Sequence, residues 1–363
     1  MTDGVSISWN SCAAAPVENI TSPARTAAQE FQLIETPSVT QLPVAQLKPK
    51  SIVFSDQPGE GLLDPAVGFI SYEVWAKSKP VQAQFLGLYP GYSEPNYDII
   101  VDGQRRRHRE RLHMYVAEAR FVIGRAPASL NLAQFATLAF AERIDPAIKH
   151  QLATATDQAR PKDARVTHNQ HPQRKWCEGR PVVICLRSTY KLEGRLPAGI
   201  QLANKIREGS RRVSETLEFD SELTVLSADE VTELGLAKLT QLDTAPVGAL
   251  EQSIFYVNQV MQFGKLLAVF QAHPADPGKT VVSIFTALAI ESNVLGKQKQ
   301  FANVPVLRNL VPAQVLNGKS SFNSGKSLSA GLPAYARNQI RSIAAILEAG
   351  GQAAGKPAVN PVR

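Results

Sequence analysis

Five arginines occur within one short stretch of the chain: Arg105, Arg106, Arg107, Arg109 and Arg111. A guanidinium group makes paired hydrogen bonds to a phosphate that a lysine ammonium group cannot make. Seven aromatic residues, with Trp75 and Tyr89 among them, lie in the preceding stretch 69–97. Proteins that bind single-stranded nucleic acid combine these two parts, because bases stack on aromatic rings and cations follow the phosphate backbone. The sequence therefore predicts a nucleic-acid interface here.

Basic residues also gather elsewhere in the chain. Lys and Arg outnumber Asp and Glu by 22 to 10 over residues 101–212 and by 9 to 1 over 292–363, whereas 213–291 holds 3 against 11. Clustered cations attract phosphates, although acidic and basic segments can also neutralise each other in a fold. Besides the arginine cluster, we expect these cations to contribute to the interface: Arg174, Lys175, Lys319, Lys326, Arg337 and Arg341.

Three Gly-Lys-Ser/Thr triplets, at 278–280, 318–320 and 325–327, suggest a phosphate-binding loop. Such a loop needs another glycine five residues before the first residue of the triplet, and none of the three has it. No aspartate follows Asp276 to hold magnesium. The sequence therefore argues against an ATPase, and we expect these lysines in exposed turns.

Metal-ligating residue types lie close together at His168, His171, Cys177 and Cys185. Their spacing matches no standard zinc site, and the apolar residues around Cys185 predict a buried strand. The chain also lacks a Gly-x-Ser-x-Gly nucleophile motif and a His-Glu-x-x-His motif. We expect a non-enzymatic protein without metal or cofactor.

The chain contains three cysteines, Cys12, Cys177 and Cys185, which are too few for a disulfide framework. This points to a reducing compartment. The first residues do not follow a signal-peptide pattern, and no apolar run approaches the ~18 residues of a membrane helix. Together these features predict a cytoplasmic protein with no membrane partner.

Composition divides the chain into segments. Hydrophobic residues make up 44% of the chain, which is ordinary for a globular protein. The mixture of strand and helix patterns predicts an α+β class, with mixed α/β possible, in two domains. We expect an extended, partly disordered arm over 1–60, a domain over 61–150, a polar linker or loop over 151–180, a second domain over 181–349 and a mobile tail over 350–363.

The first domain is expected to begin near Val67 with aromatic strands, the last of them over 97–101. A helix follows over 104–123, because apolar residues recur there at three- and four-residue spacing. The arginine cluster then occupies the first turns of this helix, where the macrodipole disfavours cations by ~0.3–1 kcal/mol each. Such an arrangement makes sense where an anionic partner supplies the missing charge.

Other elements can be predicted from their boundaries. Short strands are expected over 51–54, 181–186, 216–219 and 223–226, and helices over 132–143, 198–208 and 334–349. Ser227 and Glu230 form a capping box that begins a helix to about Leu242. The segment 250–267 is long and amphipathic, and 280–290 suits either strand or helix.

The combined pattern favours a non-enzymatic nucleic-acid-binding protein that uses phosphate contacts and base stacking. We expect single-stranded nucleic acid to be bound with weak sequence specificity, and a homo-oligomer is compatible with the alternating charged blocks. An alternative is a structural assembly subunit, of a shell or a filament, with an arm-mediated interface. An enzyme with an unrecognised site is a third hypothesis.

Overall fold

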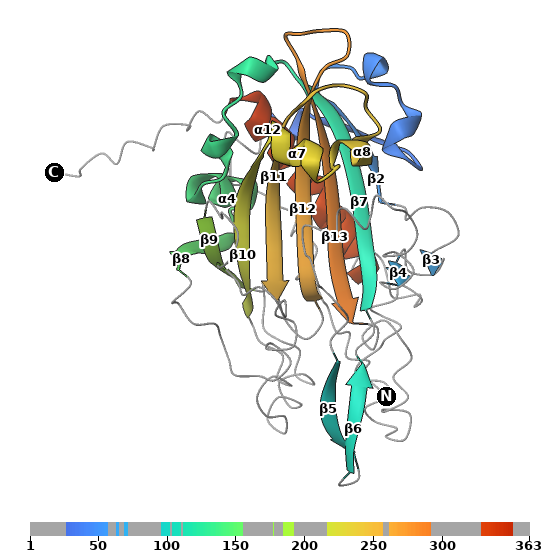
Figure 1. Ribbon diagram of the computed structural model, residues 1–363, viewed down its shortest axis with the longest axis vertical. Coiled ribbons are helices and arrows are strands. Elements are labelled where there is room, and N and C mark those ends of the chain that lie inside the picture. The colour runs from blue at the N-terminus through green and yellow to red at the C-terminus, as the bar shows by residue number, and fades with distance from the viewer. Residues whose placement is uncertain are drawn as a thin grey trace, which may run out of the picture.

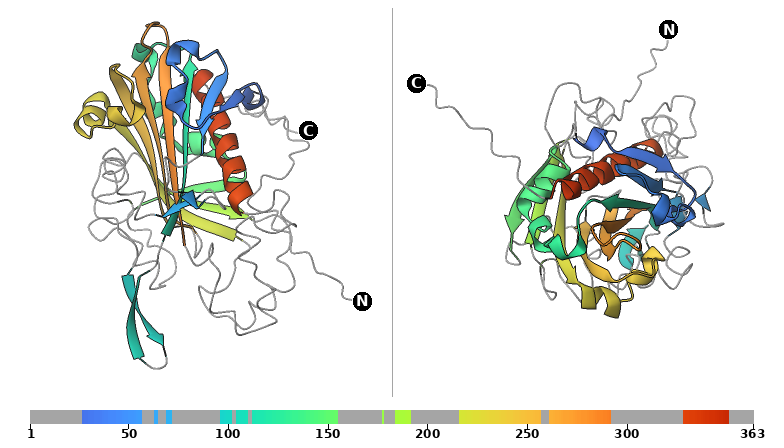
Figure 2. Two further views of the ribbon diagram at one scale, coloured as in Figure 1. Left: turned by 90° about the vertical axis from the view of Figure 1, so that its right-hand side faces the viewer. Right: turned by 90° about the horizontal axis from the view of Figure 1, so that it is seen from above.

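The computed structural model describes residues 27–56, 63–64, 69–71, 96–101, 104–109, 112–154, 177, 184–191, 216–256, 261–291 and 328–350. In these residues a large, mostly antiparallel sheet carries the long C-terminal helix and a short helix on one face and two further short helices on the other (Figures 1 and 2). The α+β class expected from the sequence is therefore confirmed.

The main sheet has eleven described strands. Nine of them follow the order β1-β2-β7-β13-β12-β11-β10-β9-β8, and off this path β4 pairs with β7 and β3 pairs with β4 (Figure 1). The parallel pair β1 and β2 is joined to antiparallel neighbours. The bounds are β1 (Gln32–Glu35), β2 (Ser51–Ser55), β3 (Leu63–Asp64), β4 (Phe69–Ser71), β7 (Leu112–Ile123), β8 (Ile148–Ala153), β9 (Ile184–Lys191), β10 (Thr216–Ser227), β11 (Pro246–Tyr256), β12 (Met261–Ala272) and β13 (Thr280–Glu291).

The helices are short except for the last. The 3₁₀ turns are η1 (Val39–Gln41), η2 (Val44–Gln46), η3 (Pro127–Ser129) and η4 (Leu132–Phe135), and the α-helices are α4 (Leu138–Ile144), α7 (Ala228–Glu233), α8 (Ala237–Thr240) and α12 (Leu328–Glu348). No helix among the described residues is both long enough and apolar enough to cross a membrane.

The central strands are buried on both faces. On β13, Val282 and Ile284 belong to the core beneath α12, whereas Phe285 and Ala287 belong to the core beneath α7 and α8. Figure 2 shows α12 and the two short helices on opposite sides of the sheet. Because both faces are covered, such strands read as continuous apolar runs without alternation. The described residues of the segment 250–267, for which the sequence predicted a long amphipathic stretch, lie in the two strands β11 and β12.

The N-terminal segment departs from the expected arm. Residues 27–56 fold onto the chain's own sheet through β1 and β2, and Phe31, Ile52 and Phe54 are buried in the core with α12. The strand expected over 51–54 is confirmed as β2, but ordered structure begins well before Val67. Few apolar residues were enough here, because Ala28, Phe31, Ile52 and Phe54 are all buried in the same core.

The boundary expected over 151–180 does not separate two sheets. Strand β7, from the first predicted domain, pairs along its whole length with β13, from the second. Strand β8 pairs with β9 in the same way, across the proposed linker. The described strands of both predicted domains therefore share one sheet, because edge-to-edge pairing joins segments that are far apart in sequence.

Local boundary signals were more accurate. Ser227 accepts a hydrogen bond from Glu230 N and Glu230 bonds back to Ser227 N, so the capping box is present at the start of α7. The predicted helix over 132–143 is present as η4 and α4, and Asn131 caps the former. The closing helix over 334–349 is confirmed as part of α12.

Candidate nucleic-acid interface

The arginine cluster lies on a two-stranded antiparallel ribbon rather than on a helix. The ribbon consists of β5 (Asn96–Val101) and β6 (Gln104–Arg109), and it forms a second sheet of its own. It lies beyond the ends of β12 and β13, apart from the main sheet (Figure 1). Arg105, Arg106, Arg107 and Arg109 occupy β6, and Arg111 falls outside the described residues.

The helix predicted over 104–123 is therefore wrong, and it is replaced by two strands, β6 and β7. In β7, Tyr115, Ala119 and Phe121 pack under α12 while Met114 packs on the opposite face. Burial of both faces produced apolar residues at three- and four-residue spacing without a helix. The sequence did contain the relevant signal, because the dipeptide Asp102-Gly103 is typical of a tight hairpin connection between two strands.

Two of the other predicted interface residues, Arg337 and Arg341, lie on α12. Arg337, on α12, donates to Glu35 on β1 (2.9 Å) and to Asp56 after β2 (3.3 Å), and its guanidinium lies 4.9 Å from the ring centre of Phe54. Burial and the neighbouring charge of Arg337 lower the pKa of Arg341. Arg337 thus attaches the N-terminal strands to α12, and we no longer include it in the interface, whereas Arg341 stays a prediction.

The remaining predicted interface residues cannot be placed. Trp75 and Tyr89, on which the stacking hypothesis depends, lie outside the described residues. The same holds for Arg174, Lys175, Lys319 and Lys326. Of the predicted interface residues, the structure therefore brings together the arginines of β6.

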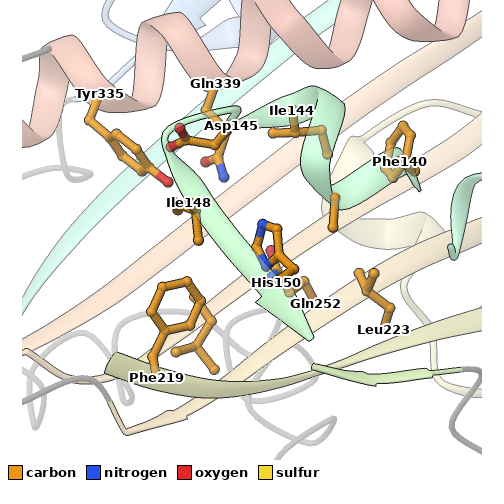
Figure 3. Close-up of a pocket in the computed structure, with 12 residues that line it drawn as sticks. Phe140, Ile144, Asp145, Ile148, His150, Phe219, Leu223, Gln252, Tyr335 and Gln339 are labelled. Carbon is orange, nitrogen blue, oxygen red and sulfur yellow. The ribbon is translucent and has the colours of Figure 1, made fainter. Parts of the chain in front are cut away.

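A pocket lies between α4, α12 and the sheet (Figure 3). Apolar side chains dominate its lining, and His150, Gln252 and Gln339 add polar groups. Its volume is about 40 Å³. A water needs ~10–15 Å³ on a comparable measure, whereas an engineered cavity that binds benzene has ~150 Å³. The enclosed space therefore suits a few water molecules and is too small for an organic ligand of ordinary size.

His150 is a titratable group in that pocket, and its pKa is shifted. Its Nδ1 lies 2.8 Å from Ser188 Oγ, and the backbone of Ala141 provides a second hydrogen bond. Burial lowers the pKa of the imidazole below its usual value of 6.5. The neutral imidazole is thus favoured, as suits a packed residue between β8 and α4.

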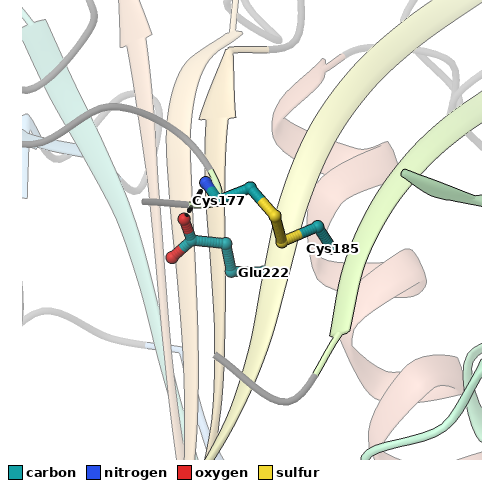
Figure 4. The surroundings of a disulfide bond; sticks show 3 residues. All are labelled: Cys177, Cys185 and Glu222. Atoms are coloured by element: carbon teal, nitrogen blue, oxygen red, sulfur yellow. Dashed lines mark hydrogen bonds between the residues drawn. A yellow bond between two sulfur atoms is a disulfide. The ribbon is translucent and has the colours of Figure 1, made fainter. Parts of the chain in front are cut away.

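A disulfide joins Cys177 to Cys185 on β9 (Figure 4). The backbone N–H of Cys177 donates to the carboxylate of Glu222, the residue on β10 that pairs with Cys185. Both thiols are used, so neither is available as a zinc ligand in this state. The bond also removes the cysteine count as an argument for a reducing compartment. The two cysteines are eight positions apart in the sequence, and the number of cysteines alone did not predict that they pair.

A row of buried polar residues continues from this disulfide across the sheet. Glu222 pairs in register with Ser253 on β11, and Ser253 pairs with Lys265 on β12. Lys265 makes a 2.5 Å ion pair with Glu251, and all four side chains are buried. These charged residues therefore lie on a buried part of the sheet and not on a solvated strand face. Buried charges that are paired are compatible with a structural role.

Comparisons with known proteins identify no family. No protein-family model and no curated protein matches the chain. The solved structures with some similarity include Ara h 8.0201 (TM-score 0.25, 10% identity, 63% of this chain and 98% of that chain). A protein from Deinococcus radiodurans has a TM-score of 0.23, 11% identity and coverage of 48% and 82%. The lipid transfer and protein localization domain of human StarD13 has a TM-score of 0.23, 10% identity and coverage of 71% and 95%. Likenesses this weak assign neither a family nor a function.

Proposed function

We propose that the protein binds nucleic acid without catalysing a reaction, through phosphate contacts of the β5–β6 ribbon. The observation that supports this is the position of four arginines on one strand of a ribbon that lies apart from the main sheet. The partner strand holds one acid, Asp98. A cationic ribbon set apart from the body can approach a polyanion without desolvating the buried core.

The test is the salt dependence of binding. Each phosphate contact releases counterions, so log K should fall with log salt by about 0.7 per contact on single strands and about 0.9 on B-DNA. Changing Arg105, Arg106 and Arg107 together to Ala should weaken binding and reduce the slope by about two to three units. Fluorescence anisotropy with labelled oligonucleotides at several salt concentrations measures both quantities.

A matched control removes the same charge elsewhere. Lys48, Lys149 and Lys238 are exposed residues of the main body. Their joint replacement by Ala should leave the slope nearly unchanged. If the arginine variant and the lysine variant lose the same affinity, net charge alone drives binding and the ribbon has no special role. Unchanged binding by the arginine variant would refute the proposal.

The proposal retains a cytoplasmic location, where most protein thiols are kept reduced. Binding should therefore be measured on protein with and without the Cys177–Cys185 bond. The alternative of an assembly subunit loses part of its basis, because residues 27–56 pack on their own chain. Large particles of pure protein, free of nucleic acid, in light scattering would revive it.

A further inference from the structure

The two faces of the β5–β6 ribbon differ in charge. Residues at alternate positions of a strand share a face. Arg105, Arg107 and Arg109 therefore fall on one face of β6, and Arg106 falls on the other. The second face is mainly apolar on the β5 side, since it includes Tyr97, Ile99 and Val101. A helix would have distributed the same arginines around its circumference, so this asymmetry follows from the ribbon.

Register narrows the basic face further. Arg107 is paired in register with Asp98, so an acidic residue occupies the position across the ribbon from it. Arg105 is paired with Ile100 and Arg109 with Asn96, and neither position carries an acid. On this face, the arginines without an acid at the paired position are therefore the two at its ends, Arg105 and Arg109.

The dimensions of this face suit the major groove of B-DNA. Two paired strands lie about 4.8 Å apart, and the groove is about 12 Å wide and admits a two-stranded ribbon. Arg109 lies four residues after Arg105 on the strand, which corresponds to about 13–14 Å at 3.3–3.4 Å per residue. Base pairs follow each other every ~3.4 Å, so this distance corresponds to about four base-pair steps.

We propose that the ribbon enters the major groove of duplex DNA with the Arg105–Arg109 face toward the bases, and that these two arginines contact guanines about four steps apart. This rests on the proposed function and names its substrate class. The guanidinium fork matches O6 and N7 of guanine, which both face the major groove. Duplex RNA is a poorer partner because its major groove is too deep and narrow for side chains to read. Single strands offer no groove.

Chemical changes to the DNA provide the decisive test. A duplex with a central alternating guanine–adenine tract has a guanine at every second position, so guanines on one strand lie four steps apart throughout the tract. Replacing these guanines by 7-deazaguanine removes the N7 acceptor and leaves the backbone charge unchanged. Each arginine–guanine contact that loses its N7 acceptor in this way should weaken binding by about fivefold or more. Replacing the adenines of the same tract by 7-deazaadenine is the matched control and should change binding less than twofold.

Neighbouring arginines of the protein provide the second control. Arg105→Ala should weaken binding to the native duplex and abolish most of the effect of 7-deazaguanine at its end of the face. Arg106→Ala removes the same charge from the other face of the ribbon. The two positions are comparable, because Arg106 is paired with Ile99 and Arg105 is paired with Ile100. The Arg106→Ala variant should leave the 7-deazaguanine effect at full size. Circular dichroism of both variants checks that the fold is retained.

The outcomes separate this inference from the proposed function. Salt-dependent binding that is equal for native and 7-deazaguanine duplexes would overturn groove entry while leaving phosphate binding in place. Binding to single-stranded DNA or duplex RNA at equal or higher affinity would overturn the substrate class. Equal loss of the 7-deazaguanine effect in Arg105→Ala and Arg106→Ala would overturn the assignment of the face. Absence of binding to every nucleic acid would refute the proposed function itself.

Discussion

Single charged residues in this protein take roles that depend on their surroundings rather than on their type. Arg337 is shared between Glu35 and Asp56 over the ring of Phe54, which joins the N-terminal strands to the last helix. Arg105 has the same side chain but lies on a separate ribbon. Sequence alone counted both as candidate phosphate ligands. What distinguishes the two arginines is the contact of Arg337 with Glu35. These residues are 302 positions apart in the sequence and meet only in the fold.

His150 leads to a prediction for pH dependence. Its pKa is lowered in the folded state by burial, whereas in the unfolded chain it has the ordinary value of 6.5. Below pH 6.5 the unfolded state therefore takes up a proton that the folded state resists, and stability falls as pH decreases. One such group contributes at most about 1.4 kcal/mol per pH unit. Urea unfolding between pH 7.5 and 5 should show a shallower loss in His150→Gln than in the wild type. Parallel pH profiles of the two proteins would contradict this role.

Elements that depend on local signals were predictable from the sequence, and those that depend on distant pairing were not. The capping box at Ser227, the cap at Asn131 and the strand β2 all follow from nearby residues. Strand β7 looked like a helix because its two faces meet different cores. The sequence predicted the arginine cluster as the candidate site, but it did not predict the geometry of the cluster. Helix and ribbon differ in which arginines share a face, and only pairing with β5 decides that.

The Cys177–Cys185 bond gives a prediction at the level of elements. It closes a loop of about nine residues, and loop closure of that size is worth about 2–3 kcal/mol in the chain-entropy account. It also holds the Cys177 N–H against the buried carboxylate of Glu222. Reduction should therefore lower the unfolding free energy of the wild type by about that amount. The Cys177→Ser, Cys185→Ser double variant should resemble the reduced protein and be insensitive to dithiothreitol. Equal stability of all three forms would show that the bond does not contribute.

The whole molecule depends on pairing between its two halves in sequence. Strand β7 lies between β2 and β13, so the sheet continues from the N-terminal strands into the C-terminal ones without a break. Helix α12, from the end of the chain, packs on β7 and on the N-terminal strands. Removal of the first half would therefore leave two elements of residues 181–349 without partners. Strand β13 would become an unpaired edge, and α12 would lose its main packing partners. An exposed apolar edge of that length invites aggregation.

This arrangement predicts that the halves do not fold separately. A fragment of residues 181–350 should be unfolded or aggregated by circular dichroism and gel filtration, and so should a fragment of residues 1–176. Coexpression of the two fragments should restore a soluble complex, because β7–β13 and β8–β9 pairing needs no covalent link between the halves. The intact chain should unfold in one cooperative transition with coincident fluorescence and circular dichroism. Two domains, as composition suggested, would instead give two stable fragments and two transitions. A folded, monomeric 181–350 fragment would therefore show that the sheet is divisible at the segment where the sequence placed its boundary.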